Sequence, residues 1–148
     1  MRVFFQNLNR TDPLEWNAIG DPHATAIAYR AKVQHHKSIG LDVTCQVTMN
    51  SNDVKSRFRT GLLQPVLDFA EVFFKESHNY ITFHDPLAAA IIFDDKICKF
   101  QSGEVTIELE NKNAIGFTNW GPGNPDSPHQ VAYEVDGERF LEHYFSFF

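Results

Sequence analysis

The sequence predicts an α/β domain in which helices flank a mixed β-sheet. The chain has 148 residues, of which 43% are hydrophobic, and this is enough for one domain with a core. Helical and strand-like patterns alternate at first, and strand-like patterns then cluster, as expected for a mixed sheet. Two cysteines and a net charge of −6 argue against a disulfide-stapled mini-protein and a disordered chain.

Caps and apolar spacing predict the elements of the first half. Asp21 followed by Pro22 is typical of a helix start, because the carboxylate can cap backbone N–H groups and proline fits the first turn. Apolar residues from Leu62 to Phe74 recur at steps of three and four, as on one face of a helix. The expected elements are a loop over 1–20, a helix over 21–32, a strand over 41–47, and helices over 51–58 and 62–77.

Alternating apolar residues predict strands in the second half. Val105, Ile107 and Leu109 would share one face of a strand. Asp136 is placed to cap a last helix. The expected elements are a buried helix from 85 to 92, strands over 97–100, 104–110, 114–120 and 131–135, a loop over 121–125, and a helix from 136.

Composition limits the partners and the location that we expect. With 19 acidic and 13 basic residues, the chain lacks the basic excess that non-specific nucleic-acid binding needs, so we expect no nucleic acid. No stretch reaches the roughly 18 apolar residues of a membrane span, so we expect no membrane. The first residues show no secretory pattern, and Cys45 and Cys98 lack metal or redox spacing. We therefore expect two reduced, buried thiols in a cytoplasmic protein.

Glu15 and Asn17, on either side of Trp16, form the first candidate site. In an extended segment, their side chains would point the same way and could receive the vicinal hydroxyls of a sugar. A plain loop with an Asx turn accounts for the same residues.

His84 and Asp85 form the second candidate site. Histidine titrates near neutral pH and can act as a general acid, and a carboxylate can bind Ca²⁺ or Mg²⁺. Asp85 precedes a proline, so capping a helix is its simpler role. The other polar pairs are expected on solvated faces, namely His35 with His36 and Glu108 with Glu110.

Five segments are similar, in order and rough spacing, to segments of one enzyme family. They are Glu15-Trp16-Asn17 with Asp21-Pro22-His23-Ala24, Gly40-Leu41-Asp42-Val43-Thr44, Phe83-His84-Asp85-Pro86-Leu87-Ala88, the stretch 105–118 that ends in Gly116-Phe117-Thr118, and the stretch 131–145. Together they resemble the C-terminal part of the nucleoside hydrolases, the inosine/uridine-preferring N-ribohydrolases. We therefore expect 1–148 to be a single domain or half-domain of that kind.

The resemblance implies an activity and roles for four residues. Nucleoside hydrolases split the N-glycosidic bond of a ribonucleoside into ribose and free base, with Ca²⁺ assisting the attack of water. Glu15 and Asn17 match residues that bind ribose hydroxyls, and Asp85 matches a calcium ligand that also meets the sugar. His84 matches the proposed acid toward the leaving base. Anionic groups around ribose would stabilise an oxocarbenium-like transition state.

The resemblance leaves two interpretations open. The family's aspartate-rich opening segment has no counterpart in the chain, and Asp85 alone makes an incomplete calcium site. The chain is either an enzyme that is complete only with an N-terminal portion, or a catalytically inactive truncated relative that acts as a structural or interaction module. Its 14 Phe residues further predict an exposed apolar patch or a homo-oligomer.

Overall fold

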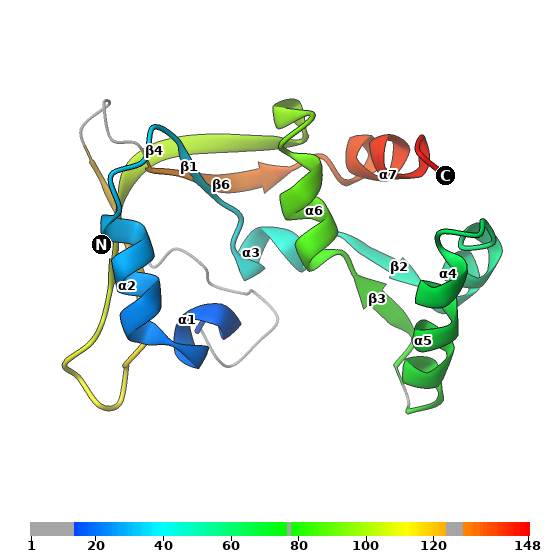
Figure 1. Ribbon diagram of the computed structural model, residues 1–148, viewed down its shortest axis with the longest axis horizontal. Coiled ribbons are helices and arrows are strands. Elements are labelled where there is room, and N and C mark those ends of the chain that lie inside the picture. Colours follow the sequence, from blue (N-terminus) through cyan, green and yellow to red (C-terminus); the bar gives the residue numbers. More distant parts are fainter. Residues whose placement is uncertain (1–13, 77, 124–128) are drawn as a thin grey trace. The chain divides into compact units, whose positions relative to one another are not determined.

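The computed structural model describes residues 14–76, 78–123 and 129–148. Contacts divide the chain into two compact units, one of Met1–Val43 with Cys98–Val135 and the other of Thr44–Ile97 with Asp136–Phe148. We call the first the sheet unit and the second the helical unit (Figure 1). Most of the loop expected over 1–20 lies outside the described residues.

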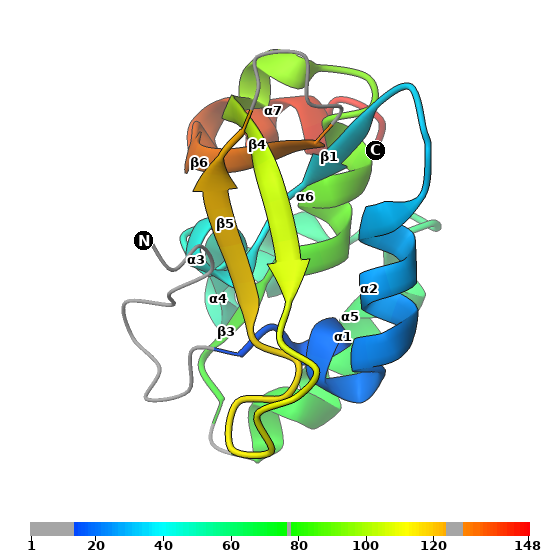
Figure 2. The ribbon, with the colours of Figure 1, turned by 90° about the vertical axis from the view of Figure 1, so that its left-hand side faces the viewer.

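The sheet unit is built on a four-stranded mixed sheet of order β1-β6-β4-β5. β1 pairs with β6 in parallel, whereas β4 is antiparallel to both β6 and β5. Figure 2 shows β4 and β5 running in opposite directions as neighbours. The unit's elements include α1 Trp16–Gly20, α2 Pro22–Arg30, β1 His36–Ser38, β4 Cys98–Ile107, β5 Thr118–Pro122 and β6 His129–Val135.

Side chains on β4, β5 and β6 form the core of the sheet unit. Val105, Trp120 and Val131 are buried together, and Tyr29 of α2 and Ile107 pack against them. The alternation expected from Val105 to Leu109 is therefore confirmed for the first two apolar residues of that pattern. One strand, β4, replaces the two that we expected over 97–100 and 104–110, and it carries a bulge between Lys99 and Phe100.

The helical unit combines a two-stranded antiparallel ribbon with several helices. Thr48 pairs with Thr82 and Asn50 with Tyr80 in this ribbon. Its elements include β2 Thr48–Asn50, α4 Ser51–Arg57, α5 Gln64–Lys75, β3 Tyr80–Thr82, α6 His84–Ala90, the 3₁₀ helix η1 Asp95–Ile97 and α7 Gly137–Phe145. The short helix α3, Leu41–Thr44, contains the division between the two units.

Aromatic rings form the core of the helical unit. Phe58 and Phe140 are fully buried, and the Phe83 ring meets the Phe140 ring edge-on with 5.4 Å between centroids. Tyr144 and Phe145 of α7 extend this ring cluster. Near the end of the chain, Phe140 is therefore core and Tyr144 and Phe145 are half-buried against it, whereas Phe147 and Phe148 are exposed.

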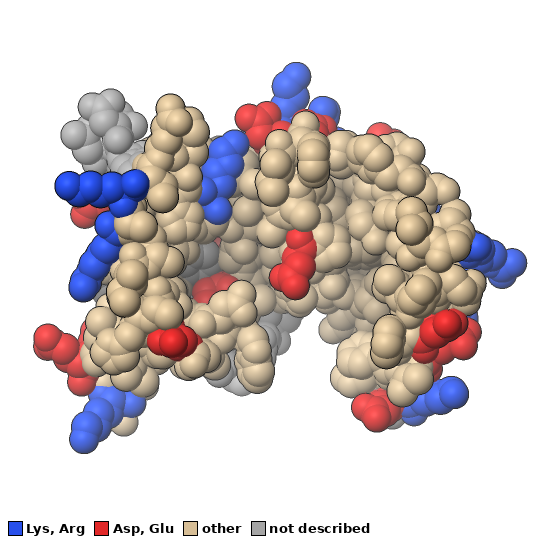
Figure 3. Space-filling model, viewed as in Figure 1, with Lys and Arg blue, Asp and Glu red and all other residues tan. Residues whose placement is uncertain are grey.

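Other apolar side chains of the helical unit are exposed. Phe69 on α5 is 79% exposed and Phe147 is 66% exposed. Leu62, Val66 and Val72 are also exposed near or on α5. Figure 3 shows basic side chains scattered among acidic ones, without a continuous basic area on the described part of that face. No helix in the described ranges is long and apolar enough to cross a bilayer.

The predicted α/β class with a mixed sheet and flanking helices is confirmed, and so are two of its caps. Asp21 accepts a hydrogen bond from the Ala24 N–H at 2.9 Å, and Asp136 accepts one from the Arg139 N–H at 3.0 Å. Asn50 caps α4, because its side-chain oxygen accepts hydrogen bonds from the Asn52 and Asp53 N–H groups.

Several expected elements were wrong. Residues 41–44 form α3 rather than the start of a strand, and 16–20 form α1 rather than a loop. A short apolar run does not distinguish the two periods, and here Val43 and Val47 are both buried at helical spacing. Residues 114–117 precede β5, while Gly121 and Pro122 belong to it rather than to a loop. The three-residue strands β1, β2 and β3 were missed because their sequences carry little apolar alternation.

Candidate active site

Glu15 and Asn17 both lie at the first helix of the sheet unit. Glu15 is the residue before α1, and its Oε1 accepts a hydrogen bond from the Leu41 N–H at 2.7 Å. Asn17 is exposed within α1. Glu15 has extended backbone dihedral angles, but Asn17 is helical, so the continuous extended segment that would have aligned the two side chains is not found.

Gly116 holds α1 in its place within the sheet unit. Its φ of +84° is in the left-handed region, which favours glycine. A Cβ at this position would lie 3.0 Å from the Ile19 Cα and 3.1 Å from the Ala18 carbonyl oxygen. The backbone of 116 thus packs directly against the helix that follows Glu15. The resemblance included this segment, but the need for glycine at 116 follows only from the structure.

His84 begins α6 in the helical unit. Its Nδ1 lies 2.7 Å from the Thr44 Oγ1, which is within hydrogen-bonding distance. Thr44 is buried (3% exposed), whereas His84 is largely exposed. A buried hydroxyl thus fixes one edge of an accessible imidazole. The antiparallel ribbon brings these residues together although 40 positions separate them.

Asp85 lies in the first turn of α6 and is exposed. The N-cap residue is Phe83, and no side chain caps this helix, so the capping role expected of Asp85 was wrong. A carboxylate in the first turn is still favoured by the partial positive charge of the helix N-terminus. Its oxygens are open to solvent and able to meet a ligand.

The described residues do not fit a calcium ion by themselves. They contain no group of three or more His, Cys, Asp or Glu side chains placed to hold a metal ion. Calcium takes roughly six to eight oxygen ligands, and Asp85 offers one carboxylate. The structure thus supplies at most a part of such a site.

A cavity of about 390 Å³ borders His84 within the helical unit. Its wall includes the Phe73 and His78 rings, which stack with 3.9 Å between centroids and 1° between their planes. Tyr80, Ile81 and Thr82 of β3 form the rest of the lining. This stack was not predicted from the sequence, although both rings precede the His84 segment.

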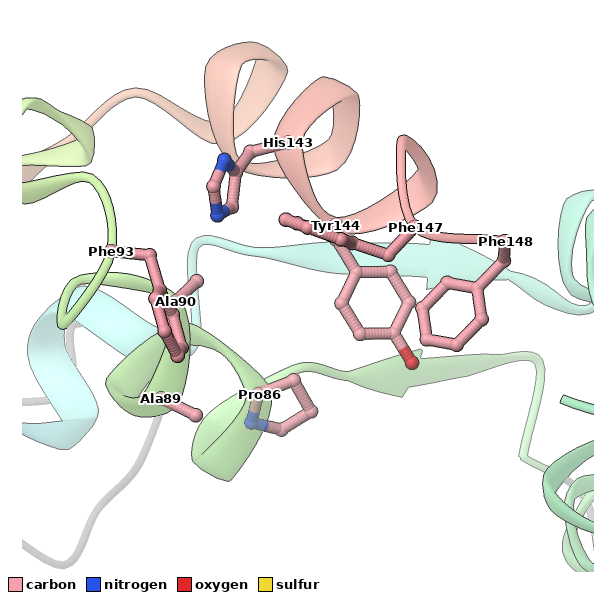
Figure 4. A pocket seen from close by; sticks show the side chains of 8 residues that line it. All are labelled: Pro86, Ala89, Ala90, Phe93, His143, Tyr144, Phe147 and Phe148. Atoms are coloured by element: carbon pink, nitrogen blue, oxygen red, sulfur yellow. The ribbon is translucent and has the colours of Figure 1, made fainter. Parts of the chain in front are cut away.

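A second cavity, of about 320 Å³, lies between α6 and α7. Figure 4 shows its lining, with the rings of Tyr144 and Phe148 next to each other at 5.1 Å between centroids. Its walls are almost wholly apolar, and His143 is the main polar residue on them. This apolar cavity offers little chemistry compared with the cavity beside His84.

Three titratable groups outside these cavities, Cys98, Cys45 and His36, are buried or half-buried in the fold. Burial raises the pKa of the Cys98 thiol to about 11, so this cysteine stays protonated at neutral pH. Cys98 is buried as expected and Cys45 is half-buried, and neither forms a disulfide. His36, expected on a solvated face, is half-buried and stacks on the Tyr29 ring at 4.7 Å.

Several solved structures that are similar to this chain are nucleoside hydrolases. A purine-preferring ribonucleoside hydrolase from Gardnerella vaginalis matches with a TM-score of 0.75 and 26% identity, covering 88% of this chain and 44% of that one. A plant nucleoside hydrolase matches with a TM-score of 0.76 and 22% identity over 93% of this chain and 48% of its own. The class defined by the fold is thus the nucleoside hydrolase class.

Sequence comparison identifies the family. The family model described as inosine-uridine preferring nucleoside hydrolase matches residues 3–142, and the chain belongs to this family. The inosine-uridine preferring nucleoside hydrolase of Crithidia fasciculata is 30% identical, with 89% of this chain and 45% of that protein covered. The protein of the same description from Leishmania major is 29% identical with the same coverage. The chain matches the C-terminal portion and spans about half the length of these relatives.

Proposed function

We propose that the chain supplies the leaving-group side of a ribonucleoside hydrolase active site. One observation carries the proposal: in a member of this family, His84 borders a cavity with stacked aromatic walls. Flat aromatic surfaces suit a flat heterocyclic base, and an imidazole at the edge can protonate it. The proposed reaction is hydrolysis of a ribonucleoside to ribose and free base.

The proposed proton path runs through His84. As the bond between C1′ and the base nitrogen breaks, its electron pair moves to the base, which takes a proton from the imidazolium. A water oxygen bonds to C1′, and the surplus proton of that water passes to the solvent. A protonated base is a better leaving group, and general acids of this kind contribute roughly 10²- to 10⁴-fold.

Glu15, Asn17 and Asp85 are proposed to meet the sugar. Their oxygens can accept hydrogen bonds from ribose hydroxyls, and the two carboxylates would stabilise positive charge that develops on the sugar. Asp85 can also supply one oxygen to a Ca²⁺ ion. The rest of that coordination shell, and with it full activity, would come from residues that match the remaining part of the family.

Two subsidiary proposals concern the setting of the protein. We propose a cytoplasmic location, which the thiols of Cys45 and Cys98 favour. We also propose that 1–148 folds as part of one larger domain, or pairs with a second copy, through exposed apolar residues such as Phe69. Size-exclusion chromatography with light scattering would distinguish a monomer from a homo-oligomer.

The test is base release from inosine and uridine, followed by ultraviolet absorbance in the presence of Ca²⁺. We expect no turnover from 1–148 alone, and turnover when a segment that matches the other half of the family is supplied. His84→Gln should lower kcat by about 10²- to 10⁴-fold, and the matched variant of an exposed histidine, His35→Gln, should not. Turnover by 1–148 alone at the rate of the combined protein would contradict the half-site proposal.

Absence of turnover in both preparations would instead support the second candidate function. In that case, the chain is an inactive relative that acts as a structural or interaction module. The exposed apolar residues on α5 favour this alternative. Calorimetric titration with Ca²⁺ and ribose separates the two, because a module without a site would bind neither.

A further inference from the structure

We propose that Thr44 is a positioning residue for His84. Its hydroxyl accepts a hydrogen bond from Nδ1–H and makes Nε2 the nitrogen that gives up and regains the proton. This inference rests on the proposed function of His84, and it adds a residue that does not itself touch the substrate.

The first support is the contact itself. The Thr44 Oγ1 lies 2.7 Å from Nδ1, a short distance for a hydrogen bond between a hydroxyl and an imidazole. Thr44 is 3% exposed, so little water competes for its hydroxyl. A hydrogen bond to one ring nitrogen determines which nitrogen remains for chemistry and which tautomer is present.

The second support is the way in which the backbone fixes both ends of the contact. The Val47 N–H donates to the Thr44 carbonyl at 3.0 Å, and the Phe83 N–H donates to the Val47 carbonyl at 3.0 Å. Thr44 lies just before β2 and His84 just after β3, and these strands are antiparallel. The start of one strand is therefore held beside the end of the other.

The third support is the anchoring of His84 in the core of the helical unit. Phe83 and Leu87, on either side of it, are 2% and 0% exposed. The Phe83 ring packs edge-on against the Phe140 and Tyr144 rings, at 5.4 Å in both cases. The backbone on both sides of His84 is thus anchored in the core, and the Thr44 hydroxyl contacts one edge of its ring.

The chemistry requires the hydroxyl to act as an acceptor. In the imidazolium, Nδ1–H donates to the Thr44 oxygen while Nε2–H is transferred to the leaving base. When the proton leaves, the electron pair of the broken Nε2–H bond stays on Nε2. The ring is then neutral and keeps its remaining proton on Nδ1. The same hydrogen bond therefore persists through the reaction, and the ring does not have to turn between cycles.

The tautomer provides a test that needs no turnover. A neutral histidine in water prefers the proton on Nε2, so a neutral ring with the proton on Nδ1 is diagnostic. We would label histidine with ¹⁵N in the full native chain and record the ring nitrogens about two pH units above the ordinary imidazole pKa of ~6.5. We expect the Nδ1–H tautomer in the wild type and in Thr44→Ser, and the Nε2–H tautomer in Thr44→Val.

Kinetics add a second readout, measured on the combined protein in which we expect turnover. Thr44→Val should lower kcat by about tenfold with little change in KM, because the lost interaction matters in the transition state. Thr44→Ser should restore the wild-type rate to within about threefold. Thr48→Val, which makes the same change at an exposed position of β2, is the matched control and should alter neither readout.

The outcomes separate this inference from the proposed function. A wild-type ring with the proton on Nε2, or an unchanged tautomer in Thr44→Val, would overturn the positioning role, whatever the activity. Suppose that Thr44→Val changes the tautomer but the wild-type protein hydrolyses no nucleoside. The hydrogen bond would then be supported, and the catalytic role of His84 would be rejected. If Thr44→Val does not fold, the wild-type tautomer alone decides.

Discussion

The sheet unit and the helical unit hold their candidate residues by different means. In the sheet unit, Glu15 is tied to the Leu41 backbone N–H, and α1 rests on the backbone of Gly116. In the helical unit, His84 is tied to a side-chain hydroxyl and anchored by the buried ring of Phe83. The position of Glu15 therefore depends on backbone contacts, including that of Gly116. The position of His84 depends on the packing of the Phe83 ring and on the Thr44 hydroxyl.

The largest effect that we predict is in the ring core of the helical unit. Phe140→Ala removes a ring that is 0% exposed and should cost about 3–5 kcal/mol of unfolding free energy, measured by urea denaturation. Phe147→Ala, at a 66% exposed ring, should cost less than about 0.5 kcal/mol.

Amide hydrogen exchange would then show whether the units respond separately. We expect Phe140→Ala to speed exchange in β2 and β3 more than in β4 and β6, since the ring belongs to the helical unit. Equal acceleration in both units would break the comparison, because the chain would then unfold as one cooperative body.

The next effect in size is at the backbone contact of the sheet unit. Gly116→Ala places a Cβ at positive φ and 3.0 Å from the Ile19 Cα, so we expect a loss of roughly 1–3 kcal/mol on thermal or urea unfolding. Gly20→Ala in α1, whose Cβ would meet no atom within 4 Å, should instead stabilise by about 0.4–1 kcal/mol. A tolerated Gly116→Ala would show that α1 is held by other contacts.

The smallest effect concerns pH and the sheet unit alone. Burial, and then the nearby charge of His129, lower the pKa of His36. The folded state therefore favours the neutral ring, and this contribution to stability is complete above the unfolded pKa of about 6.5 and is lost as pH falls through the lower folded pKa. Unfolding of β1 and β6 should become easier on acidification.

This pH dependence can be checked by hydrogen exchange at several pH values. His36→Gln should flatten the profile of the sheet unit, and His35→Gln, at the exposed neighbour, should leave it unchanged. A steeper pH dependence in the helical unit than in the sheet unit would contradict the assignment of this effect to His36.

The sequence predicted the elements that carry strong local signals. Asp21 and Asp136 predict the starts of α2 and α7, because a capping residue bonds to N–H groups in the first turn of its own helix. β1, β2 and β3 could not be found in this way, because each has three residues and is stabilised by a partner distant in the sequence. α3 was mistaken for a strand for a related reason: four residues are too few to show a period.

The residues of the candidate site could be predicted from the sequence, but the contacts that hold them could not. The resemblance singled out Glu15, Asn17, His84 and Asp85 as candidates. It could not show that Leu41 holds Glu15 or that Thr44 holds His84, since these contacts join residues 26 and 40 positions apart. The Phe73–His78 stack was missed because two rings five positions apart across a helix end carry no periodic signal.

The β2–β3 ribbon has a consequence for how this part of the protein can evolve. His84 lies directly after β3, at one end of the ribbon. The chain between β2 and β3 forms α4 and α5 and ends in the segment of His78. Closing a loop of this size costs little more when the loop is lengthened, since each doubling adds only about 0.6 kcal/mol. Insertions and substitutions between β2 and β3 can reshape the cavity without moving His84, the proposed proton donor. If the proposed function holds, the lining of the cavity can therefore diverge within a lineage while the position of His84 is inherited unchanged.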